Sequence, residues 1–393
     1  MKKKEIKDIL LVYPHLNTGG IETLIVRMVK WLSKNNYNVT LFLQKGGHLL
    51  NEIQGLDNIN IIIYEKPSRF IRYANMYFLI NKYFKNKKFD LVYSFTPSSF
   101  LLSYLVSANI RLSGVYHPLA YDKSRKSIVQ SLYKVDANFS KKLIFMNKSV
   151  KNNTEKFLEK DLTDFIFPIP INIDNNNKLF GSINSKKIVS IGRITYFKTY
   201  NFYMIDVMEE LVKKYPDYTY HIYGYGEDEE ELKQKINNSL AKENIFFHGR
   251  ISYNKIPNIL NDCFAFVGMG TSLIESCSYG IPGITALVND RNAETYGFFN
   301  KLPGYVVGSD IDGMKKYKVI NKLEELINMN EEKYKSICIS SKEKANEFDI
   351  NNVMQKFMND ISSYSKSKDS NGDYKKLNYF KYIYFCFRKK YNL

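Results

Sequence analysis

Residues 263–285 restrict most strongly what this chain can fold into. An apolar run suited to a buried strand leads into Gly268 and Gly270, and an apolar segment with helical spacing follows. Gly280 and Pro282 end that segment, because glycine caps helices and proline cannot continue them. A glycine turn between a strand and a helix directs backbone N–H groups towards an anion. The stretch therefore predicts an α/β unit with an anion-binding turn.

The size and charge of the chain set the next limits. Its 393 residues favour two domains over one. The net charge of +17 favours an anionic partner, such as nucleic acid, a phosphorylated substrate or a membrane surface. No cysteines have metal-ligand or redox spacing, and we interpret Cys263 and Cys277 as core thiols in a reducing compartment. The first apolar run, residues 9–13, is too short for a signal peptide or membrane span, so we expect a cytoplasmic protein.

Strands and helices alternate in two series, as in doubly wound α/β domains. A polar run at residues 174–178 separates them. We therefore expect an N-terminal Rossmann-like domain over residues 1–176, a C-terminal one over 177–350, and a closing helix with a tail over 351–393. Strands are predicted at residues 9–13, 39–43, 59–64, 89–95, 112–117, 142–146, 187–191, 218–223, 245–248, 263–267, 284–287 and 305–307, and late helices at 320–327, 332–348 and 351–364.

Two features of the first series follow strand carboxyl ends, where open α/β sheets bind ligands. Gly19 and Gly20 separate the first strand from its helix, and they either form a tight turn or let the backbone approach a ligand closely. The dinucleotide fingerprint G-x-G-x-x-G is absent there. His117 ends a predicted strand, and it is either structural or a ligand contact.

The second series carries the more specific chemistry. Gly192, Arg193 and Lys198 follow a predicted strand, and a guanidinium with a lysine charge on one loop suits a diphosphate. The helix start near residues 272–274 would add N–H groups and a positive dipole. Glu275 would repel phosphate but could accept hydrogen bonds from ribose hydroxyls. The candidate ligand contacts at this helix are Gly270, Thr271, Ser272, Leu273 and Glu275.

Two segments combine aromatic with basic residues. Residues 66–88 suit either a core helix with a basic rim or a helix on an anionic membrane. Residues 375–391 hold six Lys and Arg and no acid, with aromatics at helical spacing. This tail suits an anionic membrane surface, although packing on its own domain is an alternative. Nucleic acid is disfavoured as a partner because no recognition motif accompanies the tail.

Five short stretches together resemble the GT-B glycosyltransferases of the large retaining family 4. They occur in the family's order and span most of residues 9–290. The resemblance implies two Rossmann-like domains facing across a cleft, with a nucleotide-sugar donor, such as a UDP-sugar, bound mainly by the second and an acceptor by the first. The stretches are G-G-I-E at residues 19–22, I-G-R-I-x-x-x-K at 191–198, I-Y-G-Y-G at 222–226, F-H-G-R-I at 247–251 and L-I-E-S-C-S-Y-G-I-P at 273–282.

The resemblance also implies roles for single residues. Arg193 and Lys198 would hold the diphosphate and stabilise it as it leaves, in place of a metal ion. Glu275 would bind the ribose. Gly20 would pass close to the donor phosphates, and His117 would touch the sugar near the reacting carbon. No cofactor is implied beyond the donor itself.

The chain departs from the family's pattern at two positions. The family usually has two glutamates separated by seven residues; Glu275 is the second, and Val267 stands where the first would be. Residues 268–271 would then supply the missing contacts to the sugar. Thr199 replaces a common glycine after Lys198.

We expect a hexosyltransferase that extends a lipid-linked or surface polysaccharide at the inner face of a bacterial membrane. Its expected partners are a nucleotide-sugar, a glycan or lipid-linked acceptor and the anionic membrane. The alternative from another class is a non-catalytic GT-B subunit that binds a glycosyltransferase partner or an acceptor, which Val267 prompts. A sugar-nucleotide 2-epimerase on the same fold is disfavoured, because the sequence shows no matching acid/base set.

Overall fold

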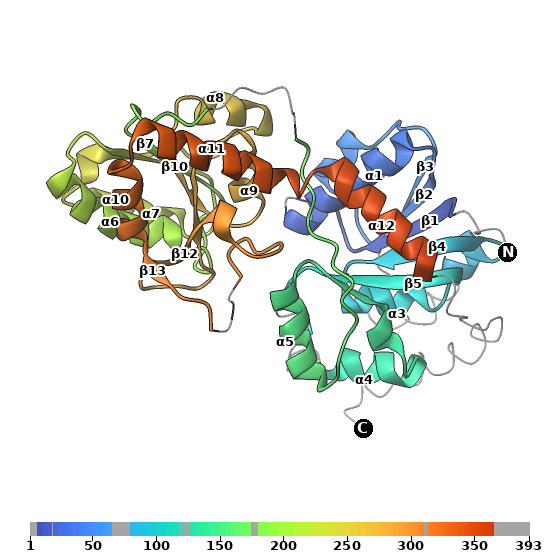
Figure 1. The fold of residues 1–393 in the computed structure, drawn as a ribbon. Coiled ribbons are helices and arrows are strands. Elements are labelled where there is room, and N and C mark those ends of the chain that lie inside the picture. Colours follow the sequence, from blue (N-terminus) through green and yellow to red (C-terminus); the bar gives the residue numbers. More distant parts are fainter. Residues whose placement is uncertain are drawn as a thin grey trace. The chain divides into compact units, whose positions relative to one another are not determined.

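The computed structural model divides the chain into two compact units (Figure 1). Unit 1 comprises Met1–Pro170 and Ile350–Leu393, and unit 2 comprises Ile171–Asp349. The boundary thus lies before the expected one at residue 176, and the closing helix groups with the N-terminal part of the chain. The residues that the structure describes are 6–17, 19–64, 79–117, 120–121, 126–173, 180–309, 311 and 313–364.

Within its described residues, unit 1 holds a six-stranded parallel sheet with strand order β3-β2-β1-β4-β5-β6. The apolar run of β1 is buried because both faces of a parallel sheet are covered. Its register pairs Leu11 with Leu41 on one side and with Tyr93 on the other. The strands are β1 (Asp8–Tyr13), β2 (Asn38–Leu43), β3 (Ile59–Ile63), β4 (Lys88–Ser94), β5 (Ser107–Val115) and β6 (Leu143–Phe145).

Local sequence sets where the helices of unit 1 begin. Thr96 caps α3 by accepting a hydrogen bond from the backbone N–H of Ser99 at 3.1 Å, and Pro97 takes the first helical position, which proline favours. Asn147 caps α5 in the same way through Val150 at 2.9 Å. The helices are α1 (Gly20–Lys34), α3 (Pro97–Ser103), α4 (Lys126–Val135), α5 (Lys148–Leu158) and α12 (Ile350–Tyr364), with 3-10 turns η1 (His48–Glu52) and η3 (Phe139–Lys142).

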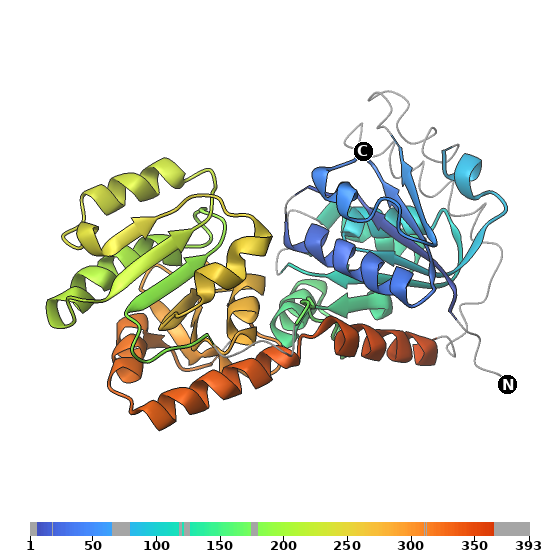
Figure 2. The ribbon, with the colours of Figure 1, turned by 90° about the horizontal axis from the view of Figure 1, so that it is seen from above.

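The helix α12 packs beside α1, as both views show (Figures 1 and 2). Phe357 stacks on Phe167 with ring centroids 4.1 Å apart, and it meets Tyr93 edge-on at 5.3 Å. Trp31 of α1 donates a hydrogen bond to the side-chain oxygen of Asn351 at 3.2 Å. These contacts explain why the closing helix belongs to unit 1.

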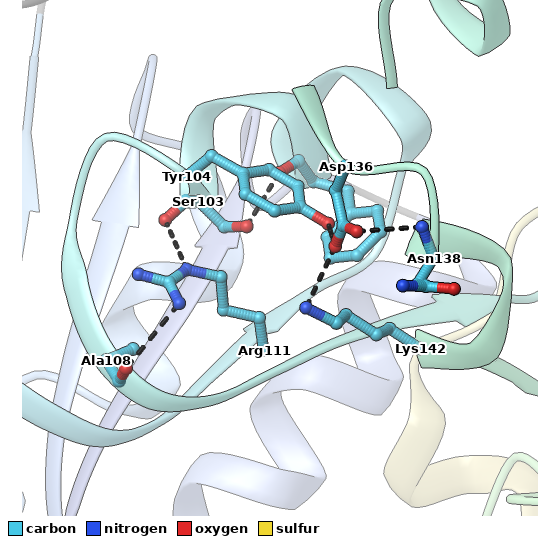
Figure 3. A network of polar contacts seen from close by, with 8 residues as sticks. Ser103, Tyr104, Ala108, Arg111, Asp136, Asn138 and Lys142 are labelled. Atoms are coloured by element: carbon cyan, nitrogen blue, oxygen red, sulfur yellow. Dashed lines mark hydrogen bonds and ion pairs between the residues drawn. The ribbon is translucent and has the colours of Figure 1, made fainter. Parts of the chain in front are cut away.

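A buried polar network joins α3, α4 and β6 in unit 1 (Figure 3). The carboxylate of Asp136 accepts from Lys142 at 2.9 Å, from the Tyr104 hydroxyl at 2.8 Å and from the backbone N–H of Asn138 at 2.8 Å. Burial alone would raise the pKa of Asp136, but these partners lower it overall. Lys142 directly precedes β6, so the network lies at the amino end of that strand, away from the carboxyl edge of the sheet.

The described part of unit 2 holds a seven-stranded sheet with strand order β13-β12-β11-β10-β7-β8-β9. The strand β12 pairs antiparallel with both of its neighbours, β11 and β13. Cys263 and Cys277 are fully buried, as predicted for core thiols. The strands are β7 (Lys187–Ile191), β8 (Thr219–Tyr223), β9 (Ile245–Phe247), β10 (Ala265–Gly268), β11 (Gly283–Ala286), β12 (Glu294–Phe298) and β13 (Tyr317–Lys318).

Helices of unit 2 follow most of its strands. The late helices confirm the predictions at residues 320–327 and 332–348 to within two residues. The α-helices are α6 (Tyr200–Lys214), α7 (Glu229–Asn237), α8 (Ile256–Leu260), α9 (Thr271–Ser278), α10 (Val319–Ile327) and α11 (Glu331–Asn346), with 3-10 turns η4 (Lys242–Asn244), η5 (Tyr253–Lys255) and η6 (Phe299–Lys301).

The strand predicted at residues 305–307 is wrong. This apolar segment is buried, but Gly304 and Gly308 flank it with positive φ values of 54° and 113°, which turn the chain away from an extended path. Val307 instead accepts a hydrogen bond from the backbone N–H of Gly270 at 2.7 Å. The sheet is completed by β12 and β13, which the sequence did not predict.

The structure does not describe either of the two predicted membrane-binding segments in full. Residues 375–391 lie wholly outside the described part of the chain, as do residues 66–78 of the other basic and aromatic segment. In the ranges that are described, none of the helices has both the length and the hydropathy that crossing a membrane requires.

Candidate functional site

Closely packed loops follow the neighbouring strands β7 and β8 of unit 2. The N–H of Gly192 after β7 donates to the carbonyl of Tyr223 at the end of β8, at 2.9 Å. A Cβ on Gly224 would stand 1.8 Å from the carbonyl oxygen of Gly192, and one on Gly226 would stand 2.0 Å from that of Ile194. The backbones therefore touch where side chains would separate them, which explains the glycines of I-Y-G-Y-G.

The loop after β7 carries both predicted cations. Arg193 is exposed and Lys198 is half-buried. The Lys198 Nζ lies 3.2 Å from where a Cβ on Gly192 would stand. Burial, and secondly the positive charge of Arg193, lower the pKa of Lys198 to about 8. A site where a neighbouring positive charge disfavours the protonated lysine is suited to receive an anion.

Asn201, which the sequence did not single out, ties this loop together. Its side-chain Nδ2 donates to the backbone carbonyls of Arg193 and Lys198, each at 3.2 Å, and its side chain is fully buried. One signal could have revealed it: this asparagine shares the buried face of α6 with Met204, Ile205 and Met208, where an apolar residue is expected.

Thr199, at the position of the family's common glycine, caps the start of α6. Its φ of −54° and ψ of −22° lie in the ordinary right-handed region, which any residue adopts. The departure from the family pattern therefore places no strain on the backbone at this position.

The turn between β10 and α9 leaves backbone N–H groups outside the helix's own hydrogen bonds. Gly270 has φ 70° and ψ −148°, a conformation that favours glycine. The first intrahelical hydrogen bond runs from the N–H of Ile274 to the carbonyl of Gly270 at 3.4 Å. The N–H groups of Thr271, Ser272 and Leu273 therefore precede the helix's own ladder, and Gly270 has no side chain to cap them.

The two residues of the family's glutamate pattern differ in their surroundings. Glu275 is buried on α9, and it shares a helix face with Thr271, four residues earlier. Val267 lies within β10 in the hydrophobic core of unit 2 and is fully buried. Its carbonyl accepts a hydrogen bond from the Ser190 hydroxyl at 2.6 Å. Position 267 therefore contributes to the core of unit 2.

The predicted residues of unit 2 come together at one edge of its sheet. The strands β7 and β10 are parallel neighbours, with Ile188 opposite Ala265 and Val189 opposite Phe266. The loops that follow them, residues 192–199 and 268–270, therefore leave the sheet side by side. Gly192, Arg193 and Lys198 are in this way brought near the N-terminus of α9.

Gly19, Gly20 and His117 lie in unit 1, each beyond the carboxyl end of a strand. His117 is exposed, two residues past β5, and its carbonyl accepts from the N–H of Ala120 at 3.0 Å. Gly19 is the N-cap of α1, and Gly20 begins the helix. The strands β1 and β5 are separated by β4, so the glycines and the histidine share an edge without being adjacent.

Glu22 folds back over the start of α1. Its carboxylate accepts from the Tyr13 hydroxyl at 3.3 Å and lies 3.7 Å from the His15 Nδ1. A Cβ on Gly19 would stand 2.2 Å from the Glu22 Oε2, whereas nothing lies within 4 Å of one on Gly20. Of the two predicted glycines, Gly20 thus has open space at its Cβ position and Gly19 does not. The role of Glu22 was not predicted, although the sequence shows it in G-G-I-E.

Comparisons with known proteins agree with this geometry. Residues 174–333 match the family model described as glycosyl transferases group 1, and residues 18–162 match that of glycosyltransferase family 4. A solved glycosyltransferase from Rickettsia africae is 17% identical, with a TM-score of 0.67, and the match covers 93% of this chain and 100% of that one. The chain belongs to the GT-B glycosyltransferases. The predicted GT-B fold class is confirmed, and membership of the retaining family 4 stays a prediction.

Other proteins also resemble this glycosyltransferase. An uncharacterized glycosyltransferase of Haemophilus influenzae is 24% identical over 276 residues, 68% of this chain and 76% of that protein. The amylovoran biosynthesis glycosyltransferase AmsD of Erwinia amylovora is 24% identical over 314 residues, 77% of this chain and 85% of that protein. A mutant of S. aureus TarM, solved with fondaparinux, alpha-GlcNAc-glycerol and UDP, is 18% identical with a TM-score of 0.53; the match covers 73% of this chain and 58% of that one.

Proposed function

We propose that this glycosyltransferase moves a hexose from a nucleoside-diphosphate donor, such as a UDP-sugar, to a glycan or lipid-linked acceptor of a cell-surface polysaccharide. One observation carries the donor half: the loop with Arg193 and Lys198 leaves the sheet beside the N-terminus of α9. Two cations and unpaired helical N–H groups suit a diphosphate. The acceptor half is supported by the relative named for amylovoran biosynthesis.

In this proposal the cations stabilise the departing diphosphate. Transfer breaks the bond between the sugar's anomeric carbon and a phosphate oxygen, and negative charge grows on the diphosphate. Arg193, Lys198 and the N–H groups at the start of α9 lie where they can stabilise that charge. The cations would replace a metal ion, and no cofactor is needed beyond the donor. Retention of the anomeric configuration has the family resemblance as its support.

The remaining predicted residues take supporting roles. Glu275 accepts hydrogen bonds from the ribose, for which its place on α9 beyond the phosphate-binding N–H groups is suited. In unit 1, Gly20 lets the backbone approach the donor phosphates, and His117 contacts the donor sugar near the reacting carbon. The exposure of His117 and the open face of Gly20 support these two roles.

The donor half is tested by titrating the chain with UDP, GDP and ADP and with their sugar derivatives. We expect one nucleotide to bind, and Arg193→Ala and Lys198→Ala each to weaken binding by at least about tenfold, since each removes a charge-assisted contact. Wild-type affinity in both variants would refute the proposed donor site. NMR of the product formed from a bound sugar nucleotide then identifies the anomeric configuration.

A non-catalytic GT-B subunit is the second candidate, because position 267 carries a core valine where the family usually has an acid. The same titration separates the two. A subunit that lacks any donor site binds none of the nucleotides, whereas an enzyme binds one and releases the free nucleoside diphosphate when supplied with acceptor.

We also propose that the enzyme acts at the inner face of the cell membrane, through the basic and aromatic residues 375–391. This part rests on the sequence alone. Replacing the lysines and arginines of that segment with glutamine should release the chain from anionic vesicles at low salt. Unchanged binding to the vesicles would contradict it.

A further inference from the structure

We propose that Asn201 is a positioning residue for the donor diphosphate: it holds Arg193 and Lys198 together from beneath their loop and does not itself touch the donor. This inference rests on the proposed function, because it assigns a role at the same donor site. Two observations support it: the hydrogen bonds that Asn201 makes to the loop, and the positive charges of Arg193 and Lys198 that the loop carries.

Asn201 binds the loop at the two residues that carry the cations. Its Nδ2 donates to the carbonyl of Arg193 and to that of Lys198, each at 3.2 Å, and its backbone N–H also donates to the carbonyl of Lys198 at 3.2 Å. Only the amide nitrogen can face two carbonyl oxygens favourably, so this orientation of the side chain is fixed. A single buried amide thus bridges both ends of the loop.

The middle of the loop is held by contacts other than the bridge: the Tyr196 hydroxyl donates to the Glu231 carboxylate, and the Tyr196 ring stacks on Phe202. Tyr196 and Phe197 lie between the cations, with 60% and 42% of their surface exposed, so burial does little to anchor them. Further backbone ties run from the N–H of Ile194 to Tyr225 at 3.0 Å and from that of Lys198 to Thr195 at 2.9 Å. The carbonyl of Phe197 also accepts from the N–H of Asn289 at 3.0 Å, and that of Ile194 from the N–H of Asp228 at 3.3 Å. The Asn201 side chain connects the backbones of both cationic residues.

The two cations repel each other, and this repulsion gives the bridge a function. The positive charge of Arg193 disfavours the protonated form of Lys198, so the charged side chains tend to separate when no anion lies between them. A bridge between their carbonyls opposes that separation at the backbone. The donor then meets cations that are already converged, and binding need not order them.

Asn244 offers a matched control within the same unit. Its Nδ2 also bridges two backbone carbonyls, those of Pro216 at 2.8 Å and Tyr218 at 3.0 Å. These residues precede β8 at the opposite end of the strand from Arg193 and Lys198. Replacing Asn244 therefore removes the same kind of bridge without disturbing the candidate site.

The test compares Asn201→Asp and Asn201→Ser with Asn244→Asp and Asn244→Ser, using whichever of UDP, GDP and ADP binds the wild-type chain. Thermal unfolding is measured first, and binding is measured below the unfolding temperature of every variant. We expect both Asn201 variants to weaken nucleotide binding by about tenfold or more, and the Asn244 variants to bind within about twofold of wild type. The serine variant covers the case in which the aspartate prevents folding.

A second readout excludes a merely structural role. In Asn201→Ser, which adds no charge, separation of the cations should move the pH midpoint of nucleotide binding upwards from its wild-type value. Wild-type affinity and midpoint in folded Asn201→Ser would overturn the inference, and the proposed function would stand if Arg193→Ala and Lys198→Ala still weakened binding. If those two variants bind as wild type, the proposed donor site itself fails.

Discussion

The carboxylate of Glu22 occupies the space that a side chain on Gly19 would need. Its Oε2 would lie 2.2 Å from a Cβ on Gly19, which is closer than any real contact. Gly19 has φ 176° and ψ 167°, an extended conformation that any residue adopts, so the glycine is required by the neighbour and not by the backbone. Gly19→Ala should therefore displace Glu22 from Tyr13 and lower stability by about 1–2 kcal/mol, as overpacking does.

A double-mutant cycle checks this relationship by chemical unfolding. In a Glu22→Ala background the obstacle is gone, so Gly19→Ala should cost at most about 0.5 kcal/mol. Equal costs in the two backgrounds would show that Glu22 is not the reason for the glycine.

Gly20 should behave differently from Gly19. Its Cβ position is open, and Gly20 is the first residue of α1, so Gly20→Ala should leave stability unchanged or raise it by up to about 1 kcal/mol. If the backbone approaches the donor phosphates here, the same methyl group should slow sugar transfer. Thermal unfolding and a transfer assay measured side by side check the pair of expectations. A stabilised variant with wild-type turnover would argue against a donor contact at Gly20.

The pKa of Lys198, lowered to about 8, predicts how donor binding depends on pH. A bound diphosphate favours the charged lysine and raises its pKa, so the attraction is fully present well below pH 8 and is lost as the pH rises from about 8 through the higher pKa of the bound lysine. Affinity for a UDP-sugar or other accepted donor should therefore fall between pH 7 and pH 9.5. Calorimetry in buffers of different ionisation enthalpy should also show proton uptake on binding near pH 8.

Lys198→Arg provides the control for the pH dependence. Arginine stays protonated throughout this range, so the fall in affinity should disappear even if the absolute affinity changes. A pH profile with the same midpoint in this variant would assign the titration to another group.

The Asp136 network should matter for stability and not for catalysis. Asp136→Asn removes the buried carboxylate that Lys142 meets at 2.9 Å and should destabilise unit 1 by about 3 kcal/mol. Asp164→Asn is the matched control: this carboxylate also meets a lysine, Lys151, at 2.9 Å, but it is 77% exposed, so its loss should cost much less than that of Asp136. Urea unfolding compares the two. Equal costs would mean that burial does not set the strength of these ion pairs.

The sequence pattern predicted most of the fold because parallel strands that are buried on both faces have continuous apolar sequences. The run at residues 187–191 matched β7 residue for residue. Prediction failed where tertiary contacts decide: Val307 looks like a strand residue but accepts its hydrogen bond from the turn at Gly270. The assignment of α12 to unit 1 likewise depends on the packing of Phe357 against Phe167, which no local pattern shows.

The sequence predicted only part of the candidate site. Arg193 and Lys198 stood out as cations after a strand, and Gly270 as a turn glycine. Asn201 did not, because its role depends on carbonyl groups that the folded loop brings to it, and any residue has a carbonyl. Glu22 was visible in its motif, but its position over Gly19 follows from a side-chain conformation.

Gly192 provides the sharpest test of how tightly the donor loop is packed. A Cβ there would lie 2.4 Å from the buried hydroxyl of Tyr200 and 3.2 Å from the Lys198 Nζ. Gly192→Ala should therefore force the tyrosine and the loop apart and weaken nucleotide binding by about tenfold or more. The first contact is with one oxygen atom, so Tyr200→Phe should relieve it.

The double variant Gly192→Ala, Tyr200→Phe should recover most of the lost affinity, because the lysine side chain can shift by a few tenths of an ångström. Gly224→Ala is the contrasting case. Its Cβ would lie 1.8 Å from the backbone carbonyl oxygen of Gly192, which no side-chain deletion can remove, so Tyr200→Phe should not rescue it. Calorimetric titration of all five variants with the bound nucleotide checks this pattern. Rescue of both alanine variants, or of neither, would contradict the assigned contacts.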